Sequence, residues 1–143
     1  MIKYSVYKKR QQDEFNKLPM KAAFGVKQFE EMMEAWGLTT SDEDLKKVAS
    51  LGAGGYCLKK DFHLFEEFGD KSAKEMEEYF KDDEQLSDAF MYEFGNHECG
   101  YTGNPMEALY ALGYTEKDVA TDERLDRIFN ETWRKYIDNI KDY

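Results

Sequence analysis

The chain has 143 residues, of which 41% are hydrophobic, including 10 Phe, 10 Tyr and 2 Trp, and its formal net charge is −10 at pH 7. This apolar content excludes a disordered acidic tail and is sufficient for one compact domain spanning residues 1–143. The negative charge excludes unaided binding to nucleic acids or anionic membranes, because the dominant phosphate term would be repulsive.

The chain also lacks the sequence features of secreted and membrane proteins. Residues 1–10 contain no apolar stretch that could form a signal-peptide core, and no run approaches the roughly 18 apolar residues that span a bilayer. Two cysteines, Cys57 and Cys99, are too few for a dense disulfide framework. We therefore expect a cytoplasmic protein with reduced thiols.

Apolar residues at steps of three and four predict about six helices, with a further helix indicated inside the N-terminal segment. The predicted helices are 29–36, 41–49, 62–80, 83–94, 105–112 and the long amphipathic helix 121–141. Predicted N-caps are Ser41, Asp61, Asp83, Asn104 and Thr121. Gly37 and Gly113 are predicted to end two of these helices.

A short sheet is predicted around the glycine-rich segment 52–55. Residues 56–59 alternate as a strand does, and residues 22–24 could pair with them. The glycines follow a predicted helix and enter a strand, which is the reverse of the order in phosphate-binding loops, so they predict a tight turn. The fold class predicted is mostly α, of α+β type, with at most two or three strands.

Charge is segregated along the chain. Residues 1–27 carry seven Lys or Arg and two acids, whereas residues 82–116 carry eight acids and no Lys or Arg. Such segregation concerns association rather than fold. Acids one helical turn apart lie about 6 Å apart, a spacing that can imitate a phosphate backbone and occupy a cationic groove.

Eight residues are therefore candidates for contact with a basic partner surface. They are the six acids Asp82, Asp83, Glu84, Asp88, Glu93 and Glu98, with Tyr92 and Tyr101 as interfacial anchors. Nothing basic lies within helical reach of Asp88, Glu93 or Glu98. Two interpretations stay open: the N-terminal bases fold over these acids, or the acids face outward.

A metal site is the main alternative. Cys57, His63, His97 and Cys99 are the only Cys and His residues and could form a tetrahedral zinc set, although their spacings depart from those of zinc motifs. His97 could also lower the pKa of the nearby Cys99 thiol, but no orienting group or oxyanion feature accompanies the pair. We expect no cofactor.

Four segments resemble a family of small acidic proteins of unknown function from Gram-positive bacteria, their phages and mobile elements. The segments are FGVKQFEEMMEAWGL (24–38), LGAGGYCLKKD (51–61), AFMYEFGNHE (89–98) and ALYALGYT (108–115). The resemblance carries over no catalytic residues. It implies a setting in a bacterial host cell, where small acidic proteins of mobile elements often inhibit restriction or CRISPR nucleases.

The residues and the resemblance together favour a non-catalytic, protein-binding inhibitor. It would be an anti-CRISPR or anti-restriction protein of a phage or mobile element that uses its acidic surface as a nucleic-acid mimic. The first alternative is a small metal-binding protein or enzyme that uses the two cysteines and two histidines. The second is a cytosolic interaction domain that associates through the apolar face of residues 121–141.

Overall fold

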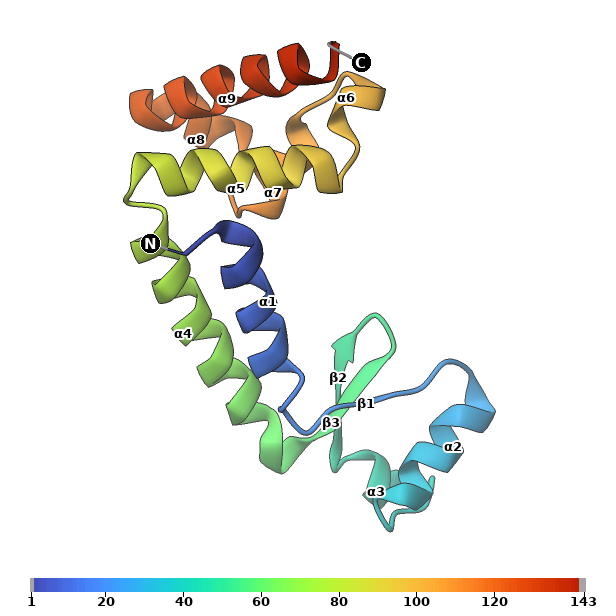
Figure 1. Ribbon diagram of the computed structural model, residues 1–143. Coiled ribbons are helices and arrows are strands. Elements are labelled where there is room, and N and C mark those ends of the chain that lie inside the picture. The colour runs from blue at the N-terminus through green and yellow to red at the C-terminus, as the bar shows by residue number, and fades with distance from the viewer. Residues whose placement is uncertain (1, 142–143) are drawn as a thin grey trace. The chain divides into compact units, whose positions relative to one another are not determined.

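The computed structural model describes residues 2–141 and is shown as a ribbon in Figure 1. Its internal contacts divide the chain into two compact units. The helical unit consists of residues 1–10 and 75–143, and the sheet unit consists of residues 11–74. The division falls inside two helices, α1 (Tyr4–Phe15) and α4 (Phe62–Tyr79).

The helical unit is built around the packing of α9 (Glu123–Lys141) on α5 (Asp83–Asn96), which lie side by side in Figure 1. Its further helices are α6 (Cys99–Thr102), α7 (Met106–Ala111) and α8 (Glu116–Thr121). Leu125, Ile128 and Phe129 of α9 are buried in one hydrophobic core with Phe90 and Phe94 of α5. The apolar stripe predicted within residues 121–141 therefore serves an internal interface.

Local hydrogen bonds decide where these helices begin. Asp82, rather than the predicted Asp83, caps α5, because its Oδ1 accepts a hydrogen bond of 3.0 Å from the backbone N–H of Gln85. The predicted cap Thr121 is the last residue of α8. Asp122 caps α9 instead, since its Oδ1 accepts a hydrogen bond of 3.1 Å from the backbone N–H of Leu125.

The sheet unit contains a three-stranded antiparallel sheet with the order β1-β3-β2. Its elements are β1 (Lys21–Ala22), α2 (Val26–Ala35), α3 (Asp42–Leu45), β2 (Val48–Gly52), β3 (Gly55–Leu58) and the 3₁₀ helix η1 (Lys59–Asp61). A second, smaller core of Ala23, Met32 and Met33 lies here, with Phe29, Trp36 and Tyr56 packed around it.

The predicted helix over residues 41–49 is wrong in its second half. Ser41 does cap a helix, but α3 ends at Leu45, and Val48 pairs with Leu58 in a hairpin. The glycine-rich segment forms the turn of this hairpin, with positive φ at Gly52 and Gly54. A Cβ at Gly54 would collide with the ring of Phe24, so this turn needs glycine for space as well as for conformation.

The mostly helical class with a small sheet is confirmed. Residues 2–141 contain nine α-helices, more than the six or so predicted, because the short helices α6 and α8 lack a long apolar stripe and were not predicted. None of the helices in this range is both long enough and apolar enough to cross a membrane.

Candidate protein-binding surface

The acids at the start of α5 are placed there by helix chemistry. Asp82 is the N-cap, and Asp83 and Glu84 occupy the first turn. Carboxylates are stabilising at this end of a helix because the unpaired N–H groups and the macrodipole are positive there. Part of the acidic run therefore has a purely local structural cause.

Asp83 is neutralised by α9. Its Oδ1 lies 2.6 Å from Arg124 Nε, and its Oδ2 lies 3.2 Å from an Nη of Arg127. Both arginines are more than forty positions away along the chain. No rule based on helical spacing could have identified them as partners of Asp83, and they are the residues that the sequence reasoning missed.

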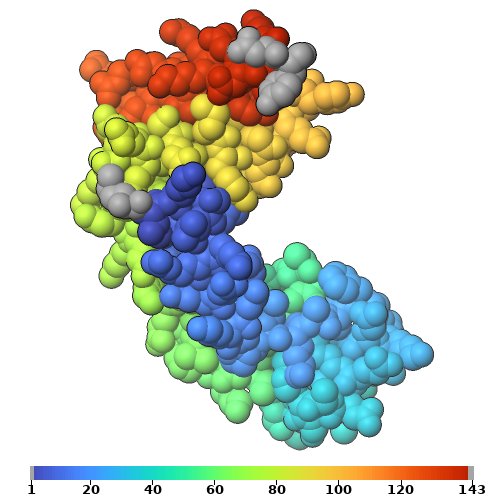
Figure 2. Space-filling view, in the orientation of Figure 1, coloured from blue at the N-terminus to red at the C-terminus, as the bar shows by residue number. Residues whose placement is uncertain are grey.

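The carboxylate of Asp88 is hydrogen-bonded to the N-terminus of α1. Its Oδ2 accepts a hydrogen bond of 2.8 Å from the backbone N–H of Tyr4, the first residue of α1. The carboxylate thus satisfies one of the N–H groups that a helix leaves unpaired at its N-terminus. Figure 2 shows the first part of α1, in dark blue, lying directly against the surface of α5.

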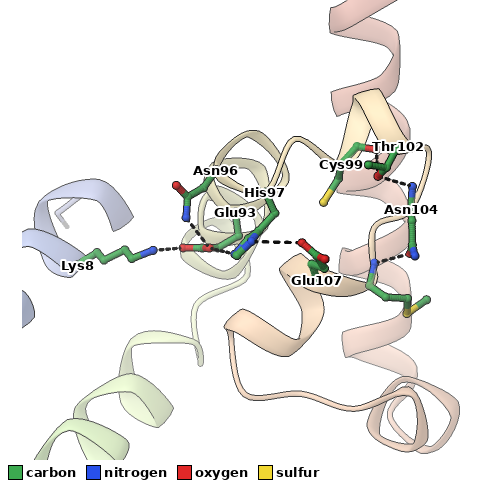
Figure 3. A network of polar contacts seen from close by, with 9 residues as sticks. Lys8, Glu93, Asn96, His97, Cys99, Thr102, Asn104 and Glu107 are labelled. Atoms are coloured by element: carbon green, nitrogen blue, oxygen red, sulfur yellow. Dashed lines mark hydrogen bonds and ion pairs between the residues drawn. The ribbon is translucent and has the colours of Figure 1, made fainter. Parts of the chain in front are cut away.

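Glu93 is buried, so the prediction that it faces a partner is wrong. One oxygen lies 2.6 Å from Lys8 Nζ and accepts a hydrogen bond of 3.1 Å from the Tyr4 hydroxyl. The other lies 3.0 Å from His97 Nε2 and accepts a bond of 3.4 Å from Asn96, as Figure 3 shows. The glutamate side chain is only 1% exposed. Its negative charge is therefore compensated by Lys8 of α1 and not by a partner protein.

The pKa of Glu93 reflects two opposed effects. Burial alone would raise this pKa, but the hydrogen bond and charge of Lys8, with hydrogen bonds from Asn96 and Tyr4, hold it below the usual carboxyl value. Burial and the adjacent Glu93 carboxylate in turn raise the pKa of the Tyr4 hydroxyl. Tyr4 therefore stays a protonated donor to an ionised acceptor at neutral pH.

His97 contacts carboxylates on both sides of its ring. Its Nε2 faces Glu93, and its Nδ1 lies 3.6 Å from a carboxylate oxygen of Glu107 on α7 (Figure 3). Cys99 is 1% exposed, and burial raises the pKa of its thiol. A buried thiol with a raised pKa is inert, so this segment lacks the chemistry of an activated nucleophile.

The four proposed metal ligands do not form a site. Cys57 is fully buried in β3, and the Nδ1 atom of the exposed His63 lies 3.0 Å from the backbone oxygen of Lys60. Across residues 2–141, no three His, Cys, Asp or Glu side chains are grouped so that they could hold a metal ion. Nothing in the geometry favours the metal-binding alternative.

Two of the candidates that face outward, Glu98 and Tyr101, lie at α6, whereas Glu84 lies in the first turn of α5. Glu84 and Glu98 are exposed, and Tyr101 is 94% exposed, whereas Tyr92 is 39% exposed and packs edge-on against Tyr4. Among the described residues, no basic side chain forms an ion pair with Glu84 or Glu98. Tyr101 is thus the most exposed large apolar side chain of the set.

A shallow groove of about 510 Å³ adjoins Tyr101. We call Glu98, Tyr101 and this groove the α6 surface; the groove is lined by Gly95, Glu98, Gly100, Tyr101, Tyr136 and Ile140. A Cβ at Gly100 would overlap the end of the Ile140 side chain and lie 3.0 Å from the Tyr136 ring, so glycine leaves room for these two side chains of α9. Tyr136 and Ile140 belong to the predicted apolar stripe, but only the tertiary structure shows that they border a groove.

Comparison with known proteins gives a family but no characterised relative. Searches of curated proteins and of solved structures found no match to the chain. The model of a family of unknown function, DUF7659, matches residues 3–135, which is nearly the whole chain and includes both compact units. The protein is therefore a member of the family of unknown function DUF7659.

Proposed function

We propose that the protein is a non-catalytic binding protein whose α6 surface contacts a basic region of another protein. The observation that carries this proposal is the 94% exposure of Tyr101 next to the exposed Glu98. A tyrosine gives a large, rigid contact area with one polar atom, and exposed tyrosines are enriched at interfaces. Glu98 and the net charge of −10 would attract a cationic partner.

Three of the six candidate acids have partners inside the protein, and this limits how the acidic surface could contact a partner. Asp83, Asp88 and Glu93 all have partners within the helical unit. A continuous row of carboxylates that imitates a phosphate backbone is therefore not formed along α5. The contact we propose depends on Tyr101 as the anchor, with long-range attraction from the acidic charge.

The partner class that we propose is the nucleic-acid-binding groove of a bacterial nuclease. Support comes from the four sequence segments that resemble proteins of Gram-positive bacteria, their phages and mobile elements. This resemblance implies a setting in which small acidic proteins often inhibit restriction or CRISPR nucleases. The protein would then act inside the bacterial host cell. Because the α6 surface would bind a cationic groove that normally holds phosphates, its affinity for the partner should decrease as the salt concentration increases.

The test compares three immobilised forms of the full chain in a bacterial lysate. One variant combines Glu98→Lys with Tyr101→Ala, and the matched control combines Tyr110→Ala with Glu116→Lys, an exposed Tyr–Glu pair of α7 and α8. We expect one partner to bind the wild type and the control, to elute at high salt, and to bind the α6 variant at least about tenfold more weakly.

Binding to the purified partner is then measured by calorimetry at two salt concentrations. Equal affinity of the α6 variant and the wild type, with both folded by circular dichroism, would refute the α6 surface as the binding site. Affinity that does not change with salt would refute a cationic groove as its target. Inhibition of the partner's nuclease activity would support the proposal that the protein is a nuclease inhibitor.

A further inference from the structure

The sheet unit contains a pocket of different character from the α6 surface. Its volume is about 420 Å³, within the range of small-molecule sites. Trp36, Leu38 and Leu58 give it apolar walls, and the other described residues that line it are lysines. We call it the lysine-rimmed pocket; its lysines are Lys46, Lys47, Lys59 and Lys60.

The β2–β3 hairpin brings the lysines together. Lys46 and Lys47 directly precede β2, and Lys59 and Lys60 directly follow β3. The pairing of the two strands and a hydrogen bond of 2.8 Å from the Lys59 N–H to the Lys47 carbonyl hold the two lysine pairs side by side. Their convergence is therefore a property of the strand register.

The wall of the pocket is also held in place. Trp36 follows α2 and packs against the smaller core, and the Nζ of Lys21 lies 6.0 Å from the centroid of its ring. Leu38 is held by a hydrogen bond of 2.8 Å from its N–H to the carbonyl of Met33. The apolar surface is thus preformed, so a ligand would not have to order it.

The charge around this pocket is opposite to that of the molecule. Among residues 2–141, none that lines it carries a carboxylate, although the chain has 30 acids and a net charge of −10. Lys47 pairs with Asp44 at 3.0 Å, but within the described chain Lys46, Lys59 and Lys60 form no ion pair. The three lysines without an ion pair therefore give the rim of the pocket a cationic character.

The lining indicates what class of ligand would bind. Trp36 provides an aromatic surface, and the lysines provide cationic donors for phosphate, sulfate or carboxylate oxygens. The described residues that line the pocket include no Asn, Gln, Ser, Thr or Asp. Polar atoms at the edge of an aromatic ligand would therefore not be recognised by such side chains. A long nucleic acid is disfavoured because the net charge repels a polyanion.

We propose that the lysine-rimmed pocket binds a small aromatic anion, a planar ring that carries a phosphate or other acidic group, as a mononucleotide does. The ring would lie against Trp36, Leu38 and Leu58, and the anionic group would lie at the rim among the lysines. This site uses residues of the sheet unit alone. It is independent of the protein-binding function proposed for the α6 surface.

The test is an NMR titration of the full chain with 1-naphthyl phosphate, followed by adenosine monophosphate. We expect the largest shift changes at the Trp36 indole N–H and at the backbone amides of residues 46–47 and 58–60. Inorganic phosphate has the anionic group without the aromatic ring, and 1-naphthol has the ring without the anionic group. We therefore expect each to bind at least about tenfold more weakly than 1-naphthyl phosphate.

Matched lysine variants separate this site from general charge attraction. The Lys46→Gln, Lys59→Gln double variant should lose about tenfold or more in affinity for 1-naphthyl phosphate. The control double variant Lys17→Gln, Lys27→Gln removes two exposed lysines of the same unit that do not line the pocket, and should bind as the wild type does. All four lysines of these variants are exposed, so both proteins should fold.

Several results would overturn the proposal. These are equal binding by the two double variants, equal binding of 1-naphthol and 1-naphthyl phosphate, or shift changes centred outside the pocket. Tighter binding of an Asp/Glu-rich peptide that has no aromatic residue would assign the pocket to an acidic segment of a protein instead. A Trp36→Leu variant that folds should weaken binding of the aromatic anion and leave that of inorganic phosphate unchanged.

Discussion

At the scale of single residues, Glu93 is the clearest case of a side chain whose role depends on a distant neighbour. Its helix offers it no Lys or Arg, which favoured the expectation of an exposed acid. The compensating ammonium comes from Lys8, 85 positions away, and one of the neutral donors comes from Tyr4. Helical spacing reports only neighbours three or four residues apart, so this pair could not be predicted from it.

Replacing Lys8 with Met should therefore destabilise the protein. The change leaves the buried Glu93 carboxylate without its cation but with its neutral donors, and we expect a loss of about 1–3 kcal/mol in the free energy of unfolding at pH 7. Urea denaturation measures this loss. Lys9→Met is the matched control because Lys9 is exposed, and its effect should stay within about 0.5 kcal/mol.

The same pair predicts a pH dependence. The pKa of Glu93 is lower in the folded protein than the ordinary value of 4.5. Its ionisation therefore stabilises the fold above that value, and this contribution is lost as the pH falls through the folded-state pKa. The stability gap between the wild type and Lys8→Met should narrow below about pH 4.5. A gap that stays constant from pH 7 to pH 3 would contradict the role of this pair.

At the scale of elements, apolar periodicity identified most helices, but their boundaries depended on polar groups. Asp82 and Asp122 cap α5 and α9, one position away from the caps predicted for them. Arg124 also bonds the carbonyl oxygens of Phe80 and Lys81 just beyond α4, at 2.7 and 3.0 Å. Such carbonyls lack partners within the helix, so this arginine of α9 serves as a C-terminal cap.

The two arginines that contact Asp83 should differ in how much they contribute to the free energy of unfolding. Arg124→Ala removes the ion pair and both carbonyl bonds, and should cost about 1–2 kcal/mol in the free energy of unfolding. Arg127→Ala removes only an exposed ion pair and should cost less than about 0.5 kcal/mol. Urea denaturation of the two single variants compares them directly. Equal losses would show that the carbonyl bonds contribute nothing.

At the scale of the whole molecule, the net charge of −10 opposes compaction. The structure offsets part of it with pairs such as Lys8–Glu93 and Arg124–Asp83. Many other acids face solvent, and their mutual repulsion is long-ranged. Salt screens repulsion between exposed charges more than attraction within a buried pair, so screening should stabilise this fold.

Thermal unfolding should show this screening. At pH 7, raising KCl from 20 to 300 mM should increase Tm by about 3–6 °C, because self-repulsion of the folded state weakens. The control is the same titration near the isoelectric point of about 4.7. Net repulsion is absent there, and the increase should largely disappear. An equal increase at both pH values would indicate a general salt effect on protein surfaces instead.

The sequence by itself determined the elements whose causes are local. The spacing of Leu125, Ile128 and Phe129 predicted the apolar face of α9, and the glycines at 52–55 predicted a turn with positive φ. It misassigned residues 46–49, because Val48 and Ala49 suit a helix or a strand equally well until a partner strand is present.

Only the tertiary structure decided which charges remain for a partner. It paired Asp83, Asp88 and Glu93 with groups from α9 and α1, left Tyr101 exposed, and joined two lysine pairs at the end of a hairpin. The physical reason is that charge compensation depends on distance in space, whereas periodicity reports distance along one helix or strand. Contacts between residues forty to ninety positions apart therefore separate structural carboxylates from those available for binding.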